Sequence, residues 1–163
     1  MATECEGNLL KKYGPYTGKT IVETGSHHEF STKLRRDSPG ATYIGVDMRD
    51  GKNVDVVHNL NTPLSLTADV VLCFSILEHC DKPWLVAQHI EQMLVPDGLL
   101  LLTVPFAWRY HPHPDDYFRF TFSGIKILFP SITWMYEDTD PPNNNLSDHP
   151  KNKVILIMAG RKQ

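Results

Sequence analysis

Four short apolar runs constrain the fold more than any other feature of the sequence. They cover residues 20–23, 42–46, 68–74 and 98–104, and each ends where polar or turn-forming residues begin. Polar and apolar residues do not alternate within them, so both faces of each run should be buried. Strands buried on both faces are typical of a parallel sheet covered by helices. A weaker run at residues 54–57 fits an edge strand.

The segments between these runs predict the covering helices. Asp81 can cap a helix that has Pro83 in its first turn. This helix would carry one apolar stripe, formed by Val86, Ile90, Met93 and Leu94. Residues 29–36 and 122–129 predict two shorter helices.

The C-terminal part predicts two further strands, at residues 132–136 and 153–158. Strands joined without a helix should pair antiparallel. The segment 137–150 between them is rich in Asp, Asn and Pro and predicts a mobile loop. The expected fold class is therefore α/β, with a mainly parallel, twisted sheet of about seven strands. Helices should cover both faces, and an antiparallel hairpin should close the sheet.

Length and composition narrow the classes of protein. A chain of 163 residues has the length of one domain, so we expect a single domain over 1–163. The net charge of -3 leaves no basic face for nucleic acid, and no segment could span a bilayer or serve as a signal sequence. The three cysteines form no C-x-x-C pair, which indicates a reducing compartment. We therefore expect a cytoplasmic protein without nucleic-acid or membrane partners, and the oligomeric state stays open.

Polar residues follow the predicted strands at the edge where an open α/β sheet binds its ligands. Gly25, after the first strand, permits a tight turn and a close backbone approach. Asp47, 22 positions later, can accept hydrogen bonds from two ribose hydroxyls. This spacing alone fits both NAD and S-adenosylmethionine. The absence of a full G-x-G-x-x-G and the predicted C-terminal hairpin disfavour an NAD-dependent oxidoreductase.

Five motifs in order resemble the class I S-adenosylmethionine-dependent methyltransferases, in a small, single-domain form similar to methyltransferase type 11. The motifs are Glu23-Thr24-Gly25, the strand ending in Asp47, His58-Asn59-Leu60, the apolar strand leading to Leu77-Glu78-His79, and Pro96-Asp97-Gly98 before the fourth run. The resemblance implies a Rossmann-like methyltransferase fold and S-adenosyl-L-methionine as the cofactor.

The resemblance also implies which residues bind the cofactor. The loop after the first strand would hold the methionine end of the cofactor, and Asp47 would bind the ribose. Met48, Asn59 and Leu60 would contact the adenine. The end of the third strand would form the floor under the sulfonium. These residues are Glu23, Gly25, Ser26, His27, Asp47, Met48, Asn59, Leu60, Phe74 and Ser75. The sequence departs from the family at 27–29, where two histidines and Glu29 replace glycines. A non-catalytic nucleoside-binding or scaffolding domain is therefore the alternative.

The segment 105–121 is the densest functional signal, because it follows the fourth strand and combines histidines, acids, arginines and aromatics. An oxygen or nitrogen acceptor needs a base, and histidine is the natural base near neutral pH. His111 and His113 are the leading candidates, with His79 third. Asp116 could orient a histidine or bind an acceptor hydroxyl, and Arg119 could hold an anionic group.

A structural interpretation of the same segment is also open. Asp115 or Asp116 could cap the next helix while Tyr117, Phe118 and Phe120 pack on the sheet. The spacing His111-x-His113-x-Asp115, with His27-His28, resembles a metal-ligand run, but prolines stiffen it and we expect no bound metal.

The residues that follow the third predicted strand indicate which class of acceptor the protein methylates. Ser75-Ile76-Leu77-Glu78 replaces the Asp/Asn-Pro-Pro-aromatic stretch of amino-methyltransferases that act on nucleobases and glutamine. The chain also has no inserted substrate domain. We therefore expect a small-molecule acceptor with an oxygen or nitrogen atom that receives the methyl group.

Overall fold

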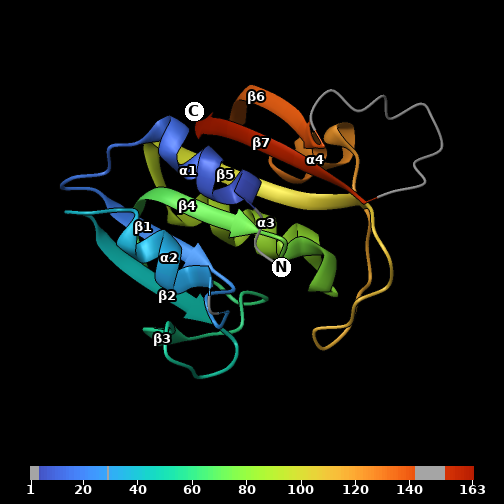
Figure 1. Ribbon diagram of the computed structural model, residues 1–163, viewed down its shortest axis with the longest axis horizontal. Helices are drawn as coiled ribbons and strands as arrows, with labels where there is room; N and C mark the ends of the chain where they lie inside the picture. Colours follow the sequence, from blue (N-terminus) through green and yellow to red (C-terminus); the bar gives the residue numbers. More distant parts are fainter. Residues whose placement is uncertain (1–3, 29, 142–152) are drawn as a thin grey trace.

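A seven-stranded mixed sheet organises the fold of the computed structural model, which describes residues 4–28, 30–141 and 153–163 (Figure 1). The strands follow the order β3-β2-β1-β4-β5-β7-β6. They are β1 (Thr20–Thr24), β2 (Thr42–Asp47), β3 (Val56–Val57), β4 (Ala68–Phe74), β5 (Leu94–Ala107), β6 (Ile132–Asp140) and β7 (Val154–Lys162). The pairs from β3 to β5 are parallel, and β7 pairs antiparallel with both β5 and β6.

Helices cover both faces of the sheet. On one face lie α1 (Glu4–Tyr13) and α2 (Phe30–Arg36), which contribute Leu9, Leu10 and Leu34 to one buried cluster. On the other face lie α3 (Pro83–Met93) and α4 (Phe122–Leu128), which contribute residues such as Ile90 and Ile125 to a second cluster. A short 3₁₀ helix, η1 (Leu77–His79), follows β4.

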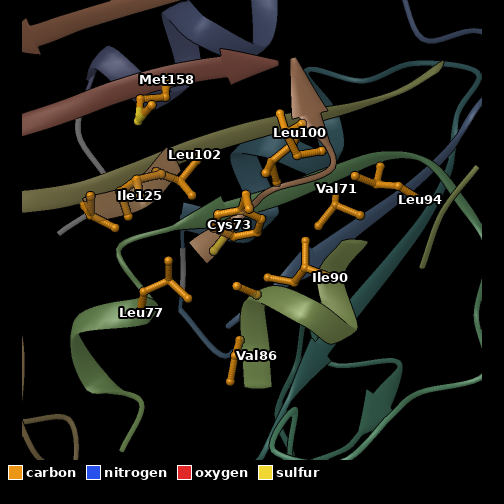
Figure 2. Close-up of a cluster of buried hydrophobic side chains, with 14 of the residues drawn as sticks. Val71, Cys73, Leu77, Val86, Ile90, Leu94, Leu100, Leu102, Ile125 and Met158 are labelled. Atoms are coloured by element: carbon orange, nitrogen blue, oxygen red, sulfur yellow. The ribbon is translucent and has the colours of Figure 1, made fainter. Parts of the chain in front are cut away.

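Neighbouring residues of the central strands pack into opposite clusters. Val70 and Leu72 of β4 belong to the cluster under α1 and α2, whereas Val71 and Cys73 belong to the cluster under α3. Figure 2 shows this second cluster, in which strand and helix side chains meet. Because successive strand residues point to opposite faces, a run without alternation is what this two-sided packing requires. The predicted α/β class, parallel sheet and C-terminal hairpin are confirmed.

Some elements differ from the prediction. Helix α1 was not predicted, and β6 extends to Asp140, so residues 137–140 are strand rather than loop. Of the remaining predicted loop, residues 142–150 lie outside the described residues. Strand β5 begins at Leu94 instead of residue 98, with the predicted turn inside it at Asp97, whose φ is 62°. The pairing shifts there, from Ala68 with Leu94 to Val70 with Leu99.

The predicted cap of α3 is wrong. Lys82 occupies the N-cap position and makes no side-chain cap hydrogen bond. The Asp81 carboxylate instead accepts a hydrogen bond from the Asn61 side-chain amide at 2.8 Å. This contact joins residues 20 positions apart, so local sequence could not indicate it. No helix in the described ranges is both long and apolar enough to cross a membrane.

Candidate active site

A cavity of about 520 Å³ lies at the carboxyl ends of β1, β2 and β4. This volume is in the range of sites for small molecules and cofactors. Most of the predicted cofactor-binding residues line it, namely Glu23, Gly25, His27, Asp47, Met48, Asn59, Leu60, Phe74 and Ser75. The structure thus brings together residues from four separate parts of the sequence.

The turn after β1 requires glycine. Gly25 has a φ of 76°, and its amide donates to the Val46 carbonyl at 2.8 Å. A Cβ on Gly25 would lie 1.8 Å from Cδ1 of Ile76, so the Ile76 side chain packs directly against this turn. The sequence indicated the turn but gave no sign of the partner from the loop after β4.

Ser26 does not line the cavity. It is fully buried beneath the turn, and its Oγ is close to the position that a Cβ on Gly45 would occupy, at 2.6 Å. In the described part of the chain this Oγ has no hydrogen-bond partner. The side chain therefore packs under the site, and only the backbone of Ser26 remains near the expected position.

Glu23 is held rigidly at the end of β1. Its carboxylate accepts hydrogen bonds from the Ser31 hydroxyl at 2.7 Å and the Tyr43 hydroxyl at 2.8 Å. Burial raises the pKa of Glu23, while these two hydrogen bonds act in the opposite direction. A buried, oriented carboxylate at this edge is suited to an ammonium group.

Asp47 joins the loops that follow β1 and β2. One carboxylate oxygen accepts from the Arg49 amide at 2.9 Å and the other from the His27 amide at 3.2 Å. Each carboxylate oxygen can accept more than one hydrogen bond, so Asp47 keeps capacity for hydroxyl donors. The contact with His27 also shows how a residue that replaces glycine is accommodated: its backbone approaches Asp47.

The opposite wall combines the half-exposed Met48 with Asn59 and Leu60. The Asn59 side-chain oxygen accepts from the Asn61 amide at 3.0 Å, which leaves its NH₂ group to donate. His58 and Asp81 also line this side. His58 belongs to the motif that the sequence matched to the adenine contact, whereas Asp81 was not predicted, because its place in the site depends on how the loop after β3 meets the loop after η1.

An ion pair between the buried carboxylate of Asp116 and the exposed Arg119 closes the segment after β5. Asp116 binds the Arg119 guanidinium with both oxygens, and one of them also accepts from the His111 backbone amide at 2.8 Å. Arg119 donates in addition to the carbonyls of Trp108 and Arg109. The Arg119 guanidinium holds the pKa of Asp116 well below its usual range.

These contacts bear on the roles predicted for Asp116 and Arg119. Neither lines the cavity, and Asp116 lies 3.0 Å from Nδ1 of His111. This distance fits the predicted role of Asp116 in orienting a histidine. Arg119 is paired with Asp116, and its predicted contact with an anionic group stays a prediction.

The capping interpretation of the same segment is wrong, and the packing interpretation is confirmed in part. Thr121 caps α4 by accepting from the Gly124 amide at 3.0 Å. Phe118 and Phe120 pack against the core. Tyr117 is half-exposed, donates its hydroxyl to Asp115 at 2.9 Å and lines the cavity.

Three imidazole rings meet at the cavity rim. The ring centroid of His79 lies 4.9 Å from that of His111 and 5.8 Å from that of His113. Nδ1 of His79 lies 2.6 Å from the Asp115 carbonyl, and burial is the main cause that lowers the pKa of His79. The three candidate bases thus lie together, although α3 and β5 separate His79 from His111 and His113 in the sequence.

One cavity residue comes from the helix that the sequence did not predict. Glu6 of α1 lines the cavity, is buried, and accepts from the Thr103 hydroxyl at 2.9 Å. The apolar residues Cys5, Leu9 and Leu10 have spacing that fits one helix face and could have indicated α1. Nothing in the local sequence indicates that Glu6 reaches the site.

A profile of the methyltransferase domain matches residues 7–138, more than half of the chain. The chain belongs to the class I S-adenosylmethionine-dependent methyltransferases. The expected family, fold, enzyme class and cofactor are confirmed. No curated protein sequence matches the chain.

Solved methyltransferase structures share the fold at low sequence identity. A 1,6-didemethyltoxoflavin-N1-methyltransferase from Burkholderia thailandensis, with its substrate and S-adenosylhomocysteine bound, has a TM-score of 0.71 and 16% identity over 96% of this chain and 76% of that one. The N-methyltransferase NodS from Bradyrhizobium japonicum, with S-adenosylhomocysteine, has a TM-score of 0.71 and 13% identity over 98% and 86%. A methyltransferase from Mesorhizobium loti has a TM-score of 0.70 and 12% identity over 96% of both chains.

The contact between Gly25 and Ile76 generates a prediction. Gly25→Ala should lower the free energy of unfolding by about 1–3 kcal/mol more than Gly18→Ala, because overpacking adds to backbone strain. Gly18 is a matched control, with a φ of 74° and no atom within 4 Å of an added Cβ. Urea unfolding of both variants gives the comparison. Equal losses for the two would contradict close packing of Ile76 on the turn.

Proposed function

We propose that this methyltransferase transfers the methyl group of S-adenosylmethionine to an oxygen or nitrogen atom of a small molecule. The observation that carries the proposal is the meeting of His79, His111 and His113 at the rim of the cavity that Asp47 and Asn59 line. Histidines at this rim can take a proton from an acceptor held beside the cofactor.

The residues present fit the cofactor. S-adenosylmethionine carries an ammonium and a sulfonium, and the carboxylates of Glu23 and Asp47 line the cavity. We assign the methionine ammonium to Glu23, the ribose hydroxyls to Asp47 and the adenine edge to Asn59. Met48 and Leu60 supply apolar surface for the adenine ring. When bound, the cofactor supplies an electrophilic methyl group and a neutral thioether leaving group.

The leaving group needs no protonation, so the protein's tasks are alignment, exclusion of water and removal of one proton. Ser75, with a φ of 52°, is a strained non-glycine residue at the floor of the cavity, as is common where a backbone must meet a ligand. His113 is exposed at the rim, so it can pass a proton from the acceptor to water. His111 is held in place by Asp116.

We further propose that the chain is one domain and works in the cytoplasm with a small-molecule acceptor. The three cysteines are all free thiols, which fits a reducing compartment. The two N-methyltransferases among the similar structures support a small acceptor at the level of the fold.

Binding of S-adenosylhomocysteine tests the role of Asp47. Asp47→Ala should weaken the affinity at least tenfold, because hydrogen bonds to a charged group contribute about 1.5–3 kcal/mol each. Asp50→Ala is the control, since this exposed carboxylate three residues later does not line the cavity. Calorimetric titration of both variants gives the dissociation constants. Unchanged affinity in Asp47→Ala would remove the ribose assignment.

Turnover tests the acceptor and the base. We expect release of S-adenosylhomocysteine with small hydroxyl or amino compounds, and no turnover with RNA, DNA or protein. His113→Ala should lower kcat about 100-fold or more and leave cofactor affinity intact, because it removes a base. Tyr110→Ala, an exposed position in the same segment outside the cavity lining, should keep full activity.

The other outcomes of this test are also informative. Methylation of a macromolecule alone would contradict the small-molecule acceptor. Intact cofactor binding without turnover on any acceptor would favour the non-catalytic alternative.

A further inference from the structure

A buried carboxylate without a partner lies directly beneath the histidine cluster. Glu78, in η1, is 1% exposed, and neither of its carboxylate oxygens has a hydrogen-bond partner on another residue in the described ranges. Buried carboxylates in native structures usually have a hydrogen-bond partner or a compensating positive charge, such as a bound ion.

The nearby arginine does not supply that charge by contact. The Arg119 guanidinium binds both oxygens of Asp116 and three backbone carbonyls. Arg119 therefore acts on Glu78 only at longer range. The groups that face Glu78 closely are the imidazoles.

Two histidines complete a set of three donors. Donor atoms of Glu78, His79 and His111 all lie within 4.8 Å of one another. Nε2 of His79 is 3.9 Å from Oε1 of Glu78. This spacing is close enough for one ion to contact all three after small side-chain shifts.

Both histidines are oriented in the way metal ligands are. Nδ1 of His79 lies 2.6 Å from the Asp115 carbonyl, and Nδ1 of His111 lies 3.1 Å from the Arg109 carbonyl and 3.0 Å from Oδ2 of Asp116. A ring that donates from Nδ1 to an oxygen has its lone pair on Nε2. Histidines that bind metals commonly donate their other ring N–H to a carbonyl or carboxylate in this manner.

We propose that Glu78, His79 and His111 bind a divalent transition-metal ion, with zinc the best match to the donor set. Two imidazoles and one glutamate are a known ligand set of catalytic zinc sites, which keep a position open for water or substrate. His79 and His111 line the cavity and Glu78 does not, so the open position faces the cavity. The sequence predicted no bound metal, and the ligands proposed here differ from the 111–115 run considered there, because the Asp115 carboxylate binds the Tyr117 hydroxyl.

The position of the ion narrows the acceptor class, an inference that rests on the proposed function. A Lewis acid at this rim favours an acceptor that has a hydroxyl group, because it lowers the pKa of that group. The hydroxyl proton moves to His113 and then to water. The new O–CH₃ bond forms as the S–CH₃ bond of S-adenosylmethionine breaks, and S-adenosylhomocysteine and a methyl ether are the products.

Metal binding can be measured without any acceptor. The full-length protein is stripped with a chelator, dialysed and titrated with Zn²⁺ by calorimetry, and with Co²⁺ by visible absorption. We expect one equivalent of either ion, with cobalt bands of a site that contains nitrogen and oxygen ligands. Glu78→Gln and His79→Gln should each weaken zinc binding at least about 100-fold, since each removes a direct ligand. His113→Gln, a change in the same cluster outside the set, should keep one equivalent.

Each outcome bears on the inference. Absence of stoichiometric zinc binding by the wild-type protein would overturn it, whether or not the variants fold. Unchanged binding in folded Glu78→Gln and His79→Gln, or loss in His113→Gln, would overturn the assigned ligands. Normal methyl transfer by metal-free protein would contradict only the proposed role of the metal in activating the acceptor hydroxyl. Failure to bind S-adenosylhomocysteine would count against the proposed function while a zinc result stood.

Discussion

Burial of the central strands on both faces is the constraint on which the rest of the structure depends. Because β1, β4 and β5 contribute side chains to the core on either side, helices must cover both faces. Polar side chains are then confined largely to the strand ends. The carboxyl ends meet at one edge, so Glu23, Asp47 and Ser75 reach a common cavity from separate strands. The site is a consequence of how the core is packed.

A second constraint acts on the acceptor side. The segment after β5 has no helix or strand between Ala107 and α4. The pair of Asp116 and Arg119 gives it shape, through hydrogen bonds to its own backbone. This ion pair thus fixes the conformation of the segment, as backbone hydrogen bonds do within the sheet. It fixes His111 beside His79, and the cofactor half and the acceptor half of the site become one cavity.

The sequence predicted those features whose causes are local. Non-alternating runs indicated the buried parallel strands, and the spacing of Gly25 and Asp47 indicated the nucleoside side of the cavity. Features set by distant contacts could not be predicted. Glu6 reaches the site by a hydrogen bond to Thr103, 97 residues away. Ser26 is turned under the site, against β2, by the packing around Gly45.

Glu78 is a residue whose chemical environment could not be predicted from the sequence. Its motif fits a structural residue at the end of a strand, and only the fold reveals that both carboxylate oxygens are buried beside two oriented imidazoles. In the sequence, His27 and His28 replace glycines after β1, which suggested a site closed to the cofactor. The structure accommodates them, because His27 meets Asp47 through its backbone amide and both His27 and His28 line the cavity.

We expect one cavity to hold the cofactor between Asp47 and the histidine cluster. A crystal structure of the complex with S-adenosylhomocysteine is the sharpest test. It should show ribose hydroxyls bonded to Asp47, adenine beside Met48 and Leu60, and the thioether sulfur facing His79, His111 and His113. A nucleoside bound elsewhere, or a sulfur atom directed away from the three imidazoles, would contradict it.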